Sequence, residues 1–218
     1  MKQSIITLLA FITILFFSCS KDRITGAGAQ GSDIRTVNNF TGVEIGGSGN
    51  VYITKADVFK VEVKGYENLL PYYQTKVENG VLHLGYPGDI QIHNSNIEVF
   101  ISMPQVNSLK IGGSGNISTS GNFENTVGLE TNISGSGNIS INSGSTKHFF
   151  STINGSGSIK AFNMVAENAE VTTNGSGSTE ITATQQLKVT INGSGNVYYK
   201  GSPVLSVDIA GSGKIIPK

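Results

Sequence analysis

The sequence predicts an all-β fold, a right-handed parallel β-helix or β-solenoid built from repeats of about 20 residues. The first observation is the phrase Gly-Ser-Gly, which occurs seven times. Its central serines from Ser114 onward are 22, 20, 20, 18 and 18 residues apart, and Ser48 precedes Ser114 by 66 residues, or three periods of 22. The second observation is the alternation of apolar and polar residues on both sides of the phrase, as in Val43–Ile45 and Val51–Ile53. This alternation is typical of strands with one buried face.

Each repeat is therefore predicted to be a strand, a Gly-rich corner, a strand and a loop. One repeat cannot bury its apolar stripe alone, but parallel stacking on its neighbours buries the stripe in a common core. Parallel crossovers are right-handed in the great majority of cases. Glycine accommodates the tight bend of such a corner, and the glycines expected to make these turns are Gly47, Gly49, Gly113, Gly115, Gly135, Gly137, Gly155, Gly157, Gly175, Gly177, Gly193, Gly195, Gly211 and Gly213.

A second feature of the corners is the residue that follows them, which is Asn in four repeats: Asn50, Asn116, Asn138 and Asn196. Stacked asparagines can pair their side-chain amides along the axis, as in cross-β ladders. Two serines, Ser158 and Ser178, interrupt this row, so we do not expect a continuous ladder.

Residues 1–19 are predicted to be a lipoprotein signal peptide rather than part of the fold. The apolar segment at residues 5–17 is too short to span a membrane as a helix and fits a secretory signal. Ser18 precedes Cys19, the one cysteine of the chain, and this ending resembles a bacterial lipobox. We expect a lipid on Cys19 to anchor the protein to the membrane without a spanning segment. The alternative is an incidental cysteine in a signal that is cut elsewhere.

The next segment, residues 20–36, is rich in Gly, Ser and Ala and is predicted to be a flexible tether. The solenoid domain is then expected at residues 37–218. Lipoprotein anchoring predicts the bacterial outer membrane as the location, and leaves open whether the domain faces the periplasm or the cell surface.

The least repetitive part of the domain is residues 51–108, which holds most of the aromatic residues. We expect it to form the N-terminal coils of the solenoid with one projecting hairpin. The turn of that hairpin is predicted at Glu78–Gly80, and a turn or short helical excursion is predicted at Glu67–Pro71.

Several of these phrases together resemble one family. They are Phe40–Val43 leading into Gly-Ser-Gly-Asn, Asn68–Pro71 with Thr75–Leu82, and Met103-Pro104 followed by Leu109–Gly115. The combination is similar to the putative auto-transporter adhesin head GIN domain, over about residues 37–218. The resemblance implies a parallel β-solenoid, often in a secreted Bacteroidetes lipoprotein. It implies no known ligand and no catalytic residues.

The composition and motifs disfavour several other functions. Lys plus Arg and Asp plus Glu each number 15, and this neutral balance argues against nucleic acid as a partner. The Gly-Ser-Gly phrase lacks the following Gly-Lys-Ser/Thr of a phosphate loop and the turn carboxylates of a calcium-binding β-roll. The three histidines are scattered, so neither a metal nor a cofactor is expected.

An enzyme acting on long sugars is the strongest catalytic alternative, because many parallel β-helices have that activity. Such a site needs clustered carboxylates, and the acidic residues here are sparse. Glu130 and Asp208 are expected at one repeat position, but in coils too distant to form a pair. We therefore expect no enzyme activity.

The leading hypothesis is a lipid-anchored envelope protein whose polar, repetitive surface binds a glycan or a protein. Tyrosines could stack on a sugar or fill an interface, and the candidates are Tyr72, Tyr73, Tyr198 and Tyr199. Packing in the core or a cap is the alternative for each. The second hypothesis is a structural component that assembles with copies of itself, because solenoid ends are open β-edges. In that case Pro217 and Lys218 blunt the C-terminal edge, or another subunit covers it.

Overall fold

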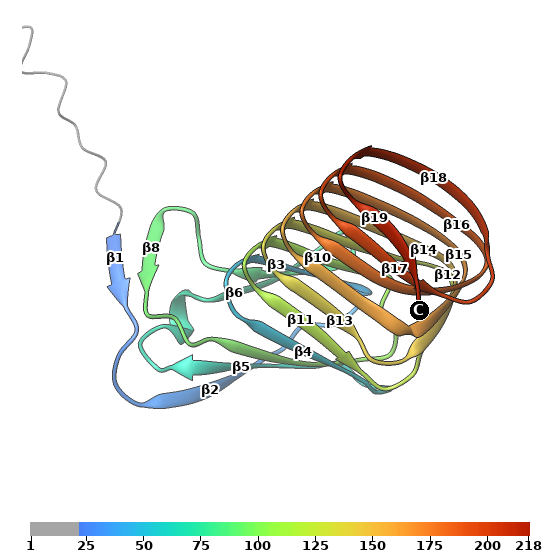
Figure 1. Cartoon of the computed structure of the whole chain (residues 1–218). Coiled ribbons are helices and arrows are strands. Elements are labelled where there is room, and N and C mark those ends of the chain that lie inside the picture. The colour runs from blue at the N-terminus through green and yellow to red at the C-terminus, as the bar shows by residue number, and fades with distance from the viewer. Residues whose placement is uncertain (1–21) are drawn as a thin grey trace, which may run out of the picture.

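A computed structural model describes residues 22–218, which form an all-β solenoid (Figure 1). The predicted signal peptide, including Cys19, lies outside the described residues. None of the helices among residues 22–218 is long and apolar enough to cross a membrane. The structure confirms the predicted fold class, and the handedness of the coil stays a prediction.

The solenoid has two faces, which meet at the Gly-Ser-Gly corners. The first face consists of parallel strands that run into the corners: β7 (Val81–Gly85), β3 (Gly42–Gly47), β10 (Ser108–Gly113), β12 (Phe123–Gly135), β14 (Gly144–Gly155), β15 (Ser158–Gly175), β16 (Ser178–Gly193) and β18 (Val204–Gly211), in this spatial order. The second face consists of parallel strands that leave the corners: β9 (Glu98–Met103), β4 (Asn50–Lys55), β11 (Asn116–Ser120), β13 (Asn138–Ile141), the first residues of β15 and β16, β17 (Asn196–Lys200) and β19 (Lys214–Pro217).

The core lies between the two faces, as the apolar alternation predicts. Ile111, Ile133 and Ile153 stand in register on the first face, and Ile117 and Ile139 stand in register on the second. All five side chains are buried. Each repeat therefore adds one layer of mostly apolar side chains to a continuous core, which supplies most of the stabilisation. A few inward positions hold a buried hydroxyl side chain instead, as at Thr131 and Ser151.

Both glycines of a corner are required: the first by backbone conformation and by space, and the second by space. Gly155 has φ of 140°, a region that L side chains rarely adopt. At Gly157 the constraint is space: a Cβ there would overlap the carbonyl oxygen of Gly137 in the preceding coil and lie 2.8 Å from Ile133 Cγ2. The corners can therefore stack closely enough for backbone bonds such as Ser156 N to Gly135 O, at 3.0 Å.

The amide ladder forms, and it runs further than predicted. Asn116 donates to Asn50 at 3.0 Å, Asn138 donates to Asn116 at 2.9 Å, and Ser158 donates to Asn138 at 2.6 Å. Ser158 thus continues the row that it was expected to interrupt. A second ladder, which the sequence did not suggest to us, precedes the corner on the first face: Asn192 donates to Asn174, and Asn174 donates to Asn154, each at 2.8 Å.

The reading of the 66-residue gap as three periods is wrong. The backbone nitrogens of Ser114 and Gly115 both bind the carbonyl oxygen of Gly47 at 3.0 Å, so these two corners are direct neighbours. The intervening chain leaves the stack and folds over its N-terminal end. We call residues 22–35 and 56–107 the cap; besides β7 and β9 it contains β1 (Asp22–Thr25), β2 (Gln30–Arg35), β5 (Lys60–Tyr66), the 3-10 helix η1 (Leu70–Tyr72), β6 (Gln74–Glu78) and β8 (Ile90–His93).

The two predicted turns of the cap are confirmed. The hairpin β6–β7 pairs Glu78 with Val81 in antiparallel fashion, and its central Asn79 and Gly80 have φ of 49° and 76°, as a type I′ turn requires. The predicted helical excursion is η1. The cap thus covers the stack with antiparallel strands, in contrast to the parallel coils that follow.

The predicted flexible tether is wrong for the described part of residues 20–36. β1 pairs in parallel with β8, and β2 pairs with β5 over six residue pairs, in antiparallel fashion. A polar, Gly-rich segment can form a strand where a neighbouring strand offers an open edge, because strand propensity depends strongly on context. The described residues before residue 37 therefore belong to the folded unit and do not form a tether.

Candidate interaction surface

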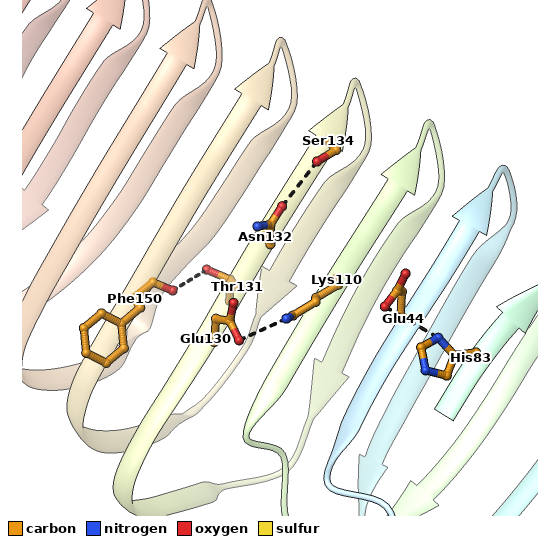
Figure 2. A network of polar contacts seen from close by, with 8 residues as sticks. All are labelled: Glu44, His83, Lys110, Glu130, Thr131, Asn132, Ser134 and Phe150. Atoms are coloured by element: carbon orange, nitrogen blue, oxygen red, sulfur yellow. Dashed lines mark hydrogen bonds and ion pairs between the residues drawn. The ribbon is translucent and has the colours of Figure 1, made fainter. Parts of the chain in front are cut away.

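The outer side of the first face carries acidic, basic and imidazole side chains on successive coils (Figure 2). His83 Nδ1 lies 3.6 Å from Glu44 Oε2, and Lys110 Nζ lies 3.2 Å from Glu130 Oε2. Further along, Lys188 Nζ lies 2.7 Å from Glu170 Oε1. These residues form two adjacent outward rows. His83, Glu44 and Lys110 stand in register in the first row. Glu130, Glu170 and Lys188 stand in the second row, which lies two residues earlier along each strand.

Phe150 places an exposed aromatic ring in the second of these rows. It stands in register between Glu130 of β12 and Glu170 of β15, and 46% of its surface is exposed. The ring stacks on that of His148, with centroids 6.2 Å apart and planes inclined by 17°. Thr131 Oγ1 donates to the Phe150 carbonyl oxygen at 3.1 Å, so the backbone below the ring is held in place. Figure 2 shows Phe150 beside Thr131 and Glu130.

A shallow groove of about 380 Å³ follows the ring along β14, β15 and β16. The flat His148–Phe150 pair can pack against an apolar surface, while the polar side chains around it offer amide donors and acceptors, a carboxylate and an ammonium group. This combination of a flat apolar platform and convergent polar groups is what a ligand site requires. The groove is lined by His148, Phe149, Phe150, Asn168, Ala169, Glu170, Gln186 and Lys188.

The predicted tyrosines do not come together. Tyr72 is 41% exposed and lies on η1 in the cap. Tyr73 is 2% exposed, and burial raises the pKa of its hydroxyl well above the usual range. A ligand cannot contact this ring, so the core-packing alternative holds for Tyr73.

The other two candidates lie on β17, at the C-terminal end of the second face. Tyr199 packs against the hydrophobic core. Tyr198 lies outward, where Lys218 Nζ approaches its ring at 5.0 Å from the centroid. Of the four tyrosines, Tyr72 and Tyr198 thus present usable surface, at opposite ends of the stack.

Sequence reasoning missed Phe150, although one signal could have found it. Counting back from the buried Ile153 in steps of two places Ser151 inward and Phe150 outward, as the structure has them. A large aromatic at an outward position has no packing role in its own coil. The adjacent Phe149 points the other way and is buried.

The carboxylates do not form a recognisable catalytic pair. Glu124 and Glu167 line one groove with Lys147 between them. Their strands are two coils apart, which corresponds to about 10 Å, and both side chains are exposed. A sugar-cleaving acid is normally desolvated and closer to its partner. No group of three or more His, Cys, Asp or Glu residues that could hold a metal ion occurs among residues 22–218.

The expected equivalence of Glu130 and Asp208 is wrong. In the pairing of successive strands, Glu130 aligns with Phe150, Glu170, Lys188 and Ser206. Asp208 lies two residues further along its strand. The residue of β12 that is equivalent to Val207 is Thr131, a buried inward threonine, and not Leu129. Counting from the nearest apolar residue therefore misplaced Glu130 by two positions.

Comparison with known proteins identifies the family. A family model described as "putative auto-transporter adhesin, head GIN domain" matches residues 39–203. The chain belongs to this family. Membership of an adhesin family indicates a protein of the cell envelope or surface. No protein of curated function matches the chain.

Solved structures share the fold of this head GIN domain. A putative adhesin from Bacteroides fragilis matches with a TM-score of 0.74 and 21% identity, over 89% of this chain and 100% of that chain. A putative adhesin from Parabacteroides distasonis matches with a TM-score of 0.61 and 23% identity, over 90% and 100% of the two chains. A putative lipid binding protein from Parabacteroides distasonis matches with a TM-score of 0.59 and 26% identity, over the same shares.

Proposed function

We propose that this head GIN domain is a non-enzymatic adhesion module that binds a glycan through the outer side of its first face. The observation that carries the proposal is the exposed Phe150 ring, stacked on His148 and flanked by charged and amide side chains. A pyranose ring has an apolar C–H side that packs on an aromatic face, and its hydroxyls need hydrogen-bond partners at the edge of that face. The groove supplies both.

The repetitive construction of the face supports an extended ligand. Coils stack at about 4.8 Å, so polar groups recur along the axis at a spacing comparable to the length of one sugar unit. Many weak polar contacts then add up along a chain of sugars, as multivalent binding does. A protein ligand is the second candidate, because an exposed aromatic is also a common anchor of protein interfaces.

The proposal includes a lipid anchor on Cys19 and location at the bacterial outer membrane. Its support is the apolar segment at residues 5–17 that ends at Ser18-Cys19. Replacing Cys19 by Ser should move the protein from the membrane fraction to the soluble fraction and remove the lipid from its mass spectrum. A protein that keeps its membrane association after Cys19→Ser would contradict the anchor while leaving the binding proposal intact.

The binding test is a glycan and extracellular-matrix array probed with the chain from Ser20 to Lys218, which contains every described strand. Phe150→Ala should lower the affinity at least about tenfold, the usual loss for an aromatic anchor. Tyr198→Ala is the matched control, because it removes an outward aromatic from the second face. Saturable binding that Phe150→Ala loses and Tyr198→Ala keeps supports the site.

Two outcomes of the array overturn the proposal. Binding that only Tyr198→Ala weakens would place the site on the second face. An absence of binding to all glycans and matrix proteins would favour the structural hypothesis, in which the solenoid assembles with copies of itself. Thermal unfolding of both variants, followed by circular dichroism, verifies that the lost side chain, and not the fold, is responsible.

A further inference from the structure

The C-terminal coil, β18 with β19, exposes apolar side chains at inward positions that the preceding coils bury. Leu205, Val207 and Ile209 are 43%, 42% and 37% exposed. They stand in register with Leu187, Val189 and Ile191 of β16, of which each is at most 1% exposed. The inward rows of the core therefore continue to the last coil, where their side chains are uncovered. β18 lies at one end of the stack (Figure 1).

The backbone edge of β18 is also open and lacks protective residues. Its neighbour in the sheet is β16, and no strand among residues 22–218 pairs with its other side. Edge strands are usually guarded by lysine, proline or inward charges. Asp208 is the one charged residue within β18, and it alternates with Val207 and Ile209 on the outward side. The predicted blunting by Pro217 applies to β19, since Pro217 pairs with Tyr199, and it leaves β18 unguarded.

The opposite end of the stack is closed. The cap lays the antiparallel strands β6 and β5 along β7 and β9, and Leu69 and Tyr73 of the cap are buried against the core. The outermost cap strands carry charges, such as Lys76 and Glu78 on β6 and Asp33 on β2. A head-to-tail contact would have to place the apolar coil on this charged cap. Repeated open-ended stacking is therefore disfavoured.

We propose that the open C-terminal coil pairs with the same coil of a second copy, tail to tail, in a closed two-fold dimer. A second copy is the partner that the geometry supports, because it presents an open coil of the same dimensions and the same apolar rows. The contact continues the coil-on-coil packing that already joins β16 to β18. An isologous interface of this kind closes on itself and does not polymerise.

The strand sequence allows this pairing. Antiparallel pairing of β18 with itself keeps the core residues inward when Val207 lies opposite Val207 of the second copy and Leu205 opposite its Ile209. In that register Asp208 faces Ser206 of the second copy, so like charges do not oppose one another. The proposal is independent of the glycan site, since Phe150 lies on β14.

The first test is sedimentation velocity of the chain from Ser20 to Lys218 at about 1 to 100 µM, the range in which a modest interface dissociates. We expect a monomer–dimer equilibrium. Val207→Lys should weaken dimerisation at least about tenfold. Val58→Lys is the matched control, because Val58 lies in the cap, is 69% exposed, and takes the same substitution. It should dimerise like the parent.

A second variant tests the same interface without depending on the folding of Val207→Lys. The chain from Ser20 onward contains no cysteine, so Ser206→Cys introduces a single exposed thiol beside the proposed two-fold axis. A short bismaleimide should link two copies of Ser206→Cys and should fail to link Val58→Cys. A chain that stays monomeric at 100 µM by sedimentation, a dimer linked through Val58→Cys instead of Ser206→Cys, or open filaments would each overturn the proposal.

Discussion

The close stacking of the corners makes a sharp prediction about the second glycine of each Gly-Ser-Gly phrase. In Gly157→Ala the new methyl group would overlap Gly137 O and lie 2.8 Å and 3.3 Å from Ile133 Cγ2 and Cδ1. One side of this contact is backbone and the other is a buried side chain, so neither can move freely. Overpacking of a tight interior costs about 1–3 kcal/mol, and we expect the upper end, about 3 kcal/mol.

Two matched substitutions separate space from backbone strain. A methyl group at Gly47 meets nothing within 4 Å, but φ is 95°, so Gly47→Ala should cost about 1–2 kcal/mol. Gly46 has room for a methyl group, with the Leu84 carbonyl oxygen at 3.8 Å. Gly46→Ala should therefore be neutral or stabilise by about 0.5 kcal/mol, by reducing the entropy of the unfolded chain.

The assay is urea unfolding followed by far-ultraviolet circular dichroism. With a slope of about 2 kcal/mol per molar urea, the midpoint of Gly157→Ala should fall by about 1.5 M and that of Gly47→Ala by about half as much. A Gly157→Ala midpoint equal to that of the parent, or above that of Gly47→Ala, would refute the argument from coil spacing.

Three further predictions concern other parts of the molecule. Asn174→Ala removes two ladder bonds and should destabilise the fold by about 1–2 kcal/mol, twice the effect of Asn192→Ala, as measured by the same unfolding assay. The Tyr73 hydroxyl has no hydrogen-bond partner among residues 22–218, so Tyr73→Phe should stabilise by about 1 kcal/mol at neutral pH. Burial raises the pKa of the Tyr73 hydroxyl above its value in the unfolded chain. The free energy of unfolding is therefore unaffected by this group below about pH 10 and falls as the pH rises further, because only the unfolded chain releases the proton. Tyr73→Phe should lack this part of the loss of stability at alkaline pH, and equal pH profiles for both proteins would contradict the reasoning. Vesicles that carry the chain coupled to lipid through Cys19 should cluster through tail-to-tail contacts, since β1 and β18 lie at opposite ends of the molecule (Figure 1); light scattering should show clustering with Val58→Lys and none with Val207→Lys.

The repeat and the alternation were sufficient to predict the solenoid, because both report directly on local backbone geometry and on which face is buried. They were insufficient for the cap. A spacing of 66 residues is compatible with three coils or with one coil step and an insertion, and only the contact between Gly47 and Ser114 distinguishes them. Similarly, composition predicted a tether at residues 20–36, whereas the open edge of β5 recruits Gln30–Arg35 as a strand.

The candidate site was harder to predict than the fold. Tyrosine content alone directed attention to Tyr73 and Tyr199, which pack inward. The orientation of Phe150 depends on strand parity, and its neighbours Glu130 and Glu170 come from other coils, so the surface exists only in the stacked structure. A register fixed from the buried isoleucines would have placed all three residues side by side.

The most direct test of the central claim uses the absence of tryptophan from the chain. In Phe150→Trp the single indole keeps an aromatic platform in the groove and reports on its surroundings. Titration with a glycan found on the array should change its fluorescence in a saturable way, with a blue shift as the ring is covered, while Tyr198→Trp should not respond. Saturable binding by calorimetry without a change at Phe150→Trp, or with a change only at Tyr198→Trp, would contradict adhesion through the first face.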